Sequence, residues 1–155
     1  MILGIDPGLN KVGWAAVHEY GGLVCAGVFQ ISDAERFFEV WGKPFDEWER
    51  DLACWTLEKC ENFTDASAGA LTLSVALGDG TGSAEISVLC SRAGLRFKLT
   101  DERMTTLEAR SLYWKVHKPI WWQRFLPISA RVPPRSLDDF AAWVIARRFI
   151  LACSI

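Results

Sequence analysis

The first thirty residues contain three apolar segments separated by tight turns. Ile2 to Asp6 is a short apolar run, and the PGLN that follows it is a typical turn sequence. Val12 to His18 and Leu23 to Ile31 form the next two segments, and Tyr20-Gly21-Gly22 joins them. Strands that follow one another through such short connections pair in antiparallel fashion, so we expect a three-stranded meander.

Beyond the meander, segments with helical spacing alternate with two more strand candidates. We expect helices over 33–41, from Phe45 through Trp55, and over 83–93, 105–116 and 137–151, with strands over 70–77 and 95–100 and a long loop over 117–135. A meander followed by alternating helices and strands predicts an α/β fold. Its mixed five-stranded sheet would join the three antiparallel strands to two parallel strands, with helices on both faces.

The length of 155 residues suits a single domain over 1–155, and an apolar fraction of 50% indicates a globular chain. The sequence contains no apolar run of about eighteen residues and begins without a basic segment followed by an apolar one. We therefore expect a cytoplasmic protein without a membrane partner. The five cysteines lack a C-x-x-C pair, which argues against a disulfide or zinc role, and all but Cys60 lie in apolar surroundings that favour a role as small core residues.

Charge is unevenly distributed along the chain, although the net charge is only −2. Residues 1–91 carry 5 Lys/Arg against 14 Asp/Glu, and residues 92–155 carry 12 against 5. A chance partition is one explanation of such a split. The alternative is one basic surface on an acidic body, which favours a nucleic-acid partner.

Asp6 is a lone carboxylate at the end of an otherwise apolar strand. The following Pro7-Gly8 turn makes a turn-capping role as good an explanation as a metal-binding role from the residues alone. Carboxylates that meet from separate strands and a helix are hard oxygen ligands, which suit Mg²⁺ or Mn²⁺. Two such ions about 4 Å apart serve phosphodiester cleavage.

Four motifs carry a resemblance to a known family. GIDPGLNKVGWAAV near the N-terminus resembles the opening of the RuvC-type Holliday junction resolvases and of the related YqgF (RuvX) nucleases. DERMTTLEA, from Asp101 to Ala109, and DDFAAWVIARRFI, from Asp138 to Ile150, are similar to two YqgF motifs. GDGTGS resembles a motif in the YqgF-like domain of the Tex transcription factors. The motifs occur in the family's order along the whole chain.

The resemblance implies an RNase H-like fold and a nuclease that depends on Mg²⁺ or Mn²⁺, with two ions expected. It implies that Asp6 is a catalytic metal ligand, joined by one acid of each adjacent pair. In the first pair we favour Glu102 over Asp101, and in the second we favour Asp138 over Asp139. A role in pairing with Arg103 or in capping the last helix is the alternative for these acids.

The chain departs from both groups of relatives after its fourth strand. GDGTGS replaces the GLP-type sequence of YqgF proteins, and the nearest acid to the RuvC glutamate is Asp79. This loop would place Asp79 beside the site or offer backbone amides to a phosphate. The tryptophan-rich loop is also atypical, so the chain resembles a divergent member.

Several basic and aromatic residues are candidates for nucleic-acid binding. Lys11 lies in the turn next to Asp6, and Arg103 has a planar guanidinium that suits a phosphate. Lys118, Trp122 and Arg124 combine positive charge with a surface on which bases stack. Core packing is the better explanation for at least one of the adjacent tryptophans 121 and 122.

Two other classes of protein remain as alternatives. A Tex-like domain would bind nucleic acid without cutting it. An actin-like ATPase lobe would also contain glycine-rich phosphate loops, although 155 residues supply only one of the two lobes such enzymes need. The residues leave open whether a nuclease of this kind would cut DNA junctions, single-stranded DNA or precursor ribosomal RNA. A symmetric junction cut would favour a homodimer.

Overall fold

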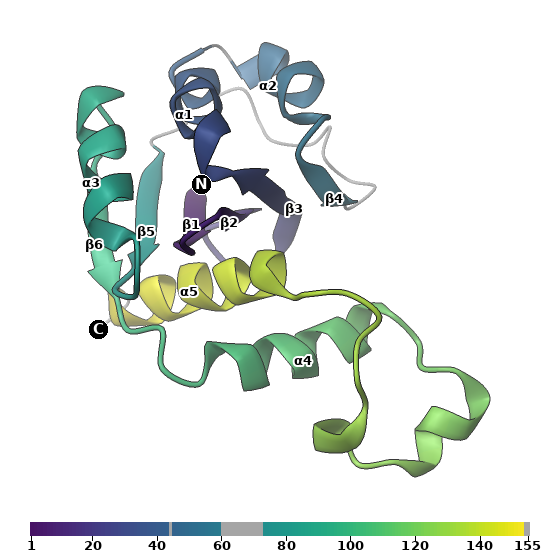
Figure 1. Ribbon diagram of the computed structural model, residues 1–155. Coiled ribbons are helices and arrows are strands. Elements are labelled where there is room, and N and C mark those ends of the chain that lie inside the picture. The colour runs from purple at the N-terminus through teal and green to yellow at the C-terminus, as the bar shows by residue number, and fades with distance from the viewer. Residues whose placement is uncertain (44, 60–72, 154–155) are drawn as a thin grey trace.

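A computed structural model describes residues 1–43, 45–59 and 73–153, and Figure 1 shows its mixed sheet between two layers of helices. The strands are β1 (Ile2–Asp6), β2 (Lys11–Val17), β3 (Leu23–Gln30), β4 (Thr56–Lys59), β5 (Ser74–Gly78) and β6 (Phe97–Thr100). Their order across the sheet is β4-β3-β2-β1-β5-β6. Strands β1 to β4 pair antiparallel, whereas β5 runs parallel to both β1 and β6.

The helices cover both faces of this sheet. They are α1 (Ala34–Trp41), α2 (Phe45–Leu52), α3 (Ser83–Arg92), α4 (Thr105–Val116) and α5 (Asp138–Cys153), with 3-10 turns η1 (Ile31–Asp33), η3 (Trp121–Phe125) and η4 (Ile128–Ala130). Helices α1 and α3 pack on one face, and α5 crosses the other with α4 beneath it (Figure 1). The α/β class, the antiparallel meander and the helices on both faces are confirmed.

The two faces of the sheet are packed differently. Large aromatic rings fill the face under α1, where Phe37 stacks on Phe29 and lies 5.4 Å from the ring of Trp14. The α5 face is packed with small side chains, and a Cβ on Gly4 would overlap the carbonyl of Ala142. A Cβ on Gly13 would likewise overlap the carbonyl of Asp138. Because Gly4 and Gly13 have no side chain, α5 lies directly on β1 and β2. This contact fixes the position of the acidic N-terminus of α5.

The sheet has six strands in the described residues, so the prediction of five was wrong. Helix α2 ends at Leu52, although Trp55 continues its apolar spacing. The amide of Trp55 closes a turn onto Leu52, and its carbonyl accepts a hydrogen bond of 3.0 Å from Val28 in β3. Trp55 thus leads into β4, whose residues alternate between half-buried and exposed. Backbone pairing with β3 outweighs the helical pattern.

Other boundaries differ by small shifts. The predicted strand over 70–77 appears as β5 from Ser74, and its first three residues lie outside the described residues, as does Cys60. Cys25 and Cys90 are buried as predicted, whereas Cys54 and Cys153 are exposed. Trp121 and Trp122 are both exposed, so the expectation that one of them packs in the core was wrong. None of the helices over the described ranges is long and apolar enough to cross a membrane.

Candidate active site

The three parallel strands end at the same edge of the sheet, and an acidic residue ends or follows each of them. Asp6 ends β1, Asp79 follows β5, and the pair Asp101-Glu102 follows β6. The N-terminus of α5 reaches the same edge, because Asp138 packs on Gly13 opposite Asp6. A hollow of about 410 Å³ opens there, and its lining includes Asp6, Lys11, Thr81 and Asp138.

The carboxyl group of Asp6 is half-buried in this hollow. Its pKa is raised to about 7, chiefly because burial disfavours the charged form. The negative charges of Glu102 and Asp138 raise the pKa further, and Lys11 opposes them. The charges of both acids that we favoured as partners from the sequence, Glu102 and Asp138, therefore act on Asp6. An acid perturbed in this way is typical of functional sites.

Glu102 folds back over the glycine-rich loop that follows β5. A Cβ on Gly80 would overlap the Glu102 carboxylate, and a Cβ on Gly78 would lie 2.6 Å from its Oε2 atom and 3.0 Å from Pro7 Cδ. Glu102 Oε2 and Pro7, the residue after Asp6, thus both lie next to Gly78. This oxygen is buried and has no hydrogen-bond partner in the described part of the chain. A buried carboxylate oxygen without a partner is unfavourable unless a cation or a donor reaches it.

The loop also positions Glu102. The Glu102 amide donates a hydrogen bond of 3.1 Å to Asp79 Oδ1, and the backbone of Gly80 donates to the Glu102 side chain. Burial and the charge of Asp79 raise the pKa of Glu102 above its ordinary value, and the hydrogen bond from Gly80 lowers it. The glycines of GDGTGS therefore leave space for a carboxylate.

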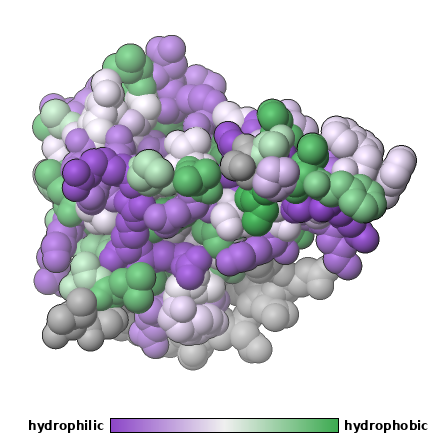
Figure 2. Space-filling model, turned by 90° about the horizontal axis from the view of Figure 1, so that it is seen from below, coloured by the Kyte–Doolittle hydropathy of each residue, from purple (hydrophilic) through white to green (hydrophobic). Residues whose placement is uncertain are grey.

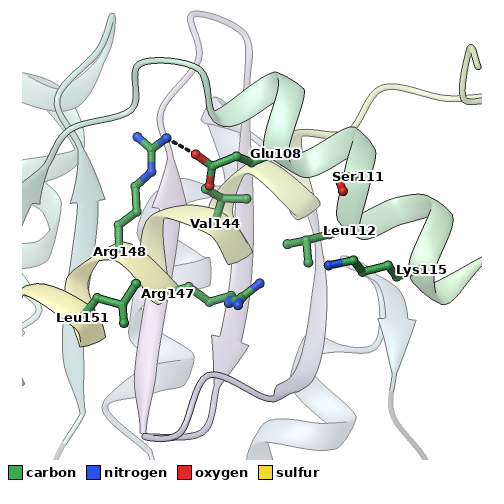
Figure 3. A pocket seen from close by; sticks show the side chains of 8 residues that line it. All are labelled: Glu108, Ser111, Leu112, Lys115, Val144, Arg147, Arg148 and Leu151. Carbon is green, nitrogen blue, oxygen red and sulfur yellow. Dashed lines mark hydrogen bonds and ion pairs between the residues drawn. The ribbon is translucent and has the colours of Figure 1, made fainter. Parts of the chain in front are cut away.

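Arg148 of α5 fixes the turn before Glu102 from the other side. Its guanidinium donates to the Asp101 carbonyl over 2.7 Å and pairs with Glu108 of α4 over 2.6 Å. Figure 3 shows this pair across a groove of about 190 Å³ between α4 and α5, with Lys115 and Arg147 pointing toward each other from the two helices. Arg148 is thus a positioning residue for the loop that carries Glu102.

Asp138 faces the hollow at the first turn of α5. Its Oδ2 atom lies 2.5 Å from Lys11 Nζ and accepts a hydrogen bond of 3.1 Å from the hydroxyl of Ser136. Lys11 also donates to Ser136 over 2.7 Å. The ammonium group of Lys11 therefore supplies the counter-charge of Asp138, and β2 is joined to the start of α5.

Asp139 is engaged elsewhere, in a buried ion pair. Its side chain is completely buried and accepts two hydrogen bonds of 2.8 Å from Arg135. The same guanidinium donates to Glu58 of β4 over 2.7 Å, and His117 Nε2 lies 3.0 Å from that carboxylate. The structure thus separates the two adjacent acids of α5 into one that faces the hollow and one that holds Arg135. Arg135 lies before the start of α5, so the pair is not an i, i+4 pair within the helix and helical spacing did not predict it.

The first pair of acids is separated in a similar way. Asp101 is exposed and binds Arg103 through hydrogen bonds of 2.9 to 3.1 Å. These contacts lower the pKa of Asp101 to about 2. Asp101 and Arg103 satisfy each other, whereas the Glu102 carboxylate lies over Gly78 and Gly80. The remaining candidates, Lys118, Trp122 and Arg124, lie on the segment between α4 and α5 and are exposed.

The acids that face the hollow provide only oxygen donors. Within 1–43, 45–59 and 73–153, no group of three or more His, Cys, Asp or Glu side chains is close enough to hold a metal ion as it stands. The donor chemistry nevertheless fits Mg²⁺ or Mn²⁺, which prefer carboxylate oxygens. The buried Glu102 Oε2 has no partner among the described residues, and burial together with nearby negative charge disfavours the ionised form of Asp6, so a cation here would stabilise both carboxylates.

Comparison with known proteins points to one family, although no family model matches the chain. The chain is 32% identical over 111 residues to the crossover junction endodeoxyribonuclease RuvC of Lawsonia intracellularis. The matched segment is 69% of this chain and 63% of that protein, so the chain spans less than two thirds of its relative's length. This match supports the RuvC-type resolvase superfamily.

The similarity to RuvC supports the broader of the two resemblances drawn from the motifs. It gives no specific support for the YqgF group, whose last motif led to the choice of Asp138 over Asp139. The contributions of Ser136, Arg135 and Glu58 were missed in the sequence. Their roles depend on contacts between segments far apart in the chain, such as Arg135 with Glu58.

Proposed function

We propose that this chain is a divalent-metal-dependent nuclease that hydrolyses phosphodiester bonds of nucleic acid. The observation that carries the proposal is the hollow at the end of β1, where Asp6 and Asp138 lie together and the charges of Asp138 and Glu102 both act on the half-buried Asp6 carboxyl group. Three carboxyl groups with one lysine are electrostatically unfavourable without a further cation. The 32% identity to a RuvC endonuclease supports the same conclusion.

In this proposal Asp6, Glu102 and Asp138 hold one or two Mg²⁺ or Mn²⁺ ions. Ions of this kind, when bound, stabilise the charge on the attacking and leaving oxygens of a phosphodiester. Gly78 and Gly80 leave room for Glu102, and Asp79 holds its backbone. Lys11 balances Asp138 in the metal-free protein, and a cation at that carboxylate would release its ammonium group toward a substrate phosphate.

Branched DNA is the substrate that we place first, because the RuvC relative is a crossover junction endodeoxyribonuclease. The YqgF-like motifs at 101–109 and 138–150 favour precursor ribosomal RNA as the alternative. Cutting a junction symmetrically requires two active sites, so we also propose a homodimer on such a substrate.

A Tex-like domain that binds nucleic acid without cutting it is the second candidate. One observation favours it: no three acidic, histidine or cysteine side chains in the described residues form a ready metal site. This candidate predicts binding to the same nucleic acids with no cleavage in either metal ion.

The proposed activity is tested on a panel of a four-way DNA junction, single-stranded DNA and structured RNA, with Mg²⁺, Mn²⁺ or EDTA. We expect metal-dependent cleavage of at least one substrate and a loss of at least about a hundredfold in Asp6→Asn, as loss of transition-state stabilisation of about 3 kcal/mol would give. Equal cutting by Asp6→Asn, or binding without cutting by the parent protein, would overturn the proposal.

Gly80→Ala tests the position of Glu102 in the same assay. Gly80 has no positive φ, and an added Cβ meets the Glu102 carboxylate, so the side chain of Glu102 must move. We expect cleavage to fall at least tenfold with the melting temperature nearly unchanged. Gly42→Ala is the matched control, because its Cβ would lie 3.5 Å from its nearest neighbour, at ordinary contact distance. Unchanged cleavage in Gly80→Ala would contradict a role for Glu102.

A further inference from the structure

The segment between α4 and α5, residues 117–137, projects from the body of the molecule (Figure 1), and we name it the aromatic arm. Its large apolar side chains are unusually exposed: Trp121 is 74% exposed, Phe125 84% and Val132 74%. Figure 2 shows the arm at the right of the underside, where hydrophobic and weakly polar residues gather beside hydrophilic ones. A cluster of exposed aromatic residues on a projection is typical of a binding surface.

The charge of the aromatic arm identifies the kind of partner. Residues 117–137 contain no Asp or Glu, and they include Lys118, Arg124, Arg131 and Arg135. Arg135 is used by Asp139 and Glu58, whereas Lys118 and Arg124 are exposed. A surface that combines aromatic rings with positive charge and lacks negative charge suits a polyanion with flat apolar groups. Unpaired nucleic acid has this chemistry.

Contacts within the aromatic arm fix the backbone that carries its exposed rings. Gln123 Oε1 accepts a hydrogen bond of 3.2 Å from the Ile120 amide, which closes the 3-10 turn that carries Trp121 and Phe125. Arg131 donates to the carbonyls of Leu126 and Arg124 over 2.9 and 3.2 Å. The exposed rings are therefore presented on a structured loop, which reduces the entropy lost when they bind a ligand.

The root of the aromatic arm adjoins the candidate active site. Ser136, one residue after Arg135, contacts both Lys11 and Asp138 at the hollow. Arg135 anchors the root to α5 and to β4 through Asp139 and Glu58. Nucleic acid at the acids of the hollow would therefore lie beside the base of the arm.

We propose that the aromatic arm binds unpaired bases of the substrate next to the cleavage position. Trp121 and Phe125 stack on the bases, and Lys118 and Arg124 contact the adjacent phosphates. The arm thereby selects nucleic acid that is unpaired or branched over continuous duplex. This inference rests on the proposed nuclease function, because it places the arm's ligand beside the active site.

Binding in EDTA tests the aromatic arm separately from cleavage. We would measure the affinity of the full chain for a fluorescent single-stranded oligonucleotide, a four-way junction and a duplex of the same length. We expect the Trp121→Ala/Phe125→Ala variant to bind the single strand at least tenfold more weakly, as the loss of two stacked bases predicts, with duplex affinity changed less than twofold. Tyr20→Ala is the matched control, because Tyr20 is an aromatic residue outside the arm and is 77% exposed.

Three results would overturn the inference. The first is unchanged single-strand affinity in the double variant, and the second is an equal loss for single strand and duplex. The third is a change of oligomeric state in the double variant by light scattering, since the rings would then cover a second copy of the chain. None of these binding results bears on metal-dependent cleavage, so the nuclease proposal would stand if only the role of the arm were wrong. Absence of cleavage by the parent protein with Mg²⁺ or Mn²⁺ would instead count against the proposed nuclease.

Discussion

Asp6→Asn is expected to stabilise the metal-free protein by roughly 2 kcal/mol at pH 8, although it removes the side chain on which the proposed cleavage depends. The pKa of Asp6 is raised from about 3.8 to about 7 in the folded chain. The folded state therefore holds a proton that the unfolded state releases. The free energy of unfolding therefore falls as the pH rises from about 3.8 to about 7, and the loss is complete above pH 7. The magnitude is reduced from the full shift because the side chain is partly exposed.

The pH dependence separates this effect from a general change in packing. We would measure urea unfolding of the parent protein and of Asp6→Asn in EDTA between pH 4 and pH 8. The two proteins should have similar free energies of unfolding near pH 4 and diverge as the pH rises. Asp101→Asn is the control, because Arg103 already balances that carboxylate and its pKa is lowered. Asp6→Asn less stable than the parent at pH 8 would contradict the site electrostatics.

Arg135→Met is expected to destabilise the chain by about 3–5 kcal/mol, because it leaves the carboxylate of Asp139 buried without its partner. Glu58 would lose the same guanidinium, and the root of the aromatic arm would lose its tie to β4. For a chain of this size we expect the melting temperature to fall by roughly 10 °C. Calorimetry or thermal unfolding by circular dichroism measures the change.

Arg124→Met is the matched control for this substitution, since Arg124 is an exposed arginine of the same arm. A surface change of this kind should alter stability by less than about 0.5 kcal/mol. Arg135→Met/Asp139→Asn completes a double-mutant cycle, and we expect a coupling energy of at least about 2 kcal/mol. Equal stability of Arg135→Met and Arg124→Met would show that Asp139 does not depend on Arg135.

Much of the fold is predictable from local patterns in the sequence. The meander of β1 to β3 follows from short apolar segments and tight turns, and α4 begins and ends at the predicted residues. The added strand β4 was missed because its position depends on hydrogen bonds with β3, which no local pattern contains. Trp55 shows the difficulty, since its spacing fits a helix while its carbonyl bonds to the sheet.

The candidate site was predictable to the level of adjacent pairs of acids. Adjacent strand residues face opposite ways, so only one of Asp101 and Glu102 was expected to point at Asp6, whereas Asp138 and Asp139 were both kept as candidates with Asp138 preferred. Which one does so depends on tertiary contacts. Asp139 forms an ion pair with Arg135, and Asp101 forms one with Arg103. The Glu102 carboxylate occupies the space over Gly80. Only the contact of Glu102 with Gly80 joins distant segments, but the two short-range pairs also depend on how the loops before α4 and α5 fold.

Manganese binding, measured by electron paramagnetic resonance of free and bound Mn²⁺, tests the central claim most directly. The account predicts that the parent protein binds Mn²⁺ and that both Asp6→Asn and Glu102→Gln weaken this binding at least tenfold. Asp101→Asn should bind as the parent does, because Asp101 is exposed and paired with Arg103. Unchanged Mn²⁺ affinity in Asp6→Asn, or no binding by the parent protein, would contradict a metal site at the end of β1.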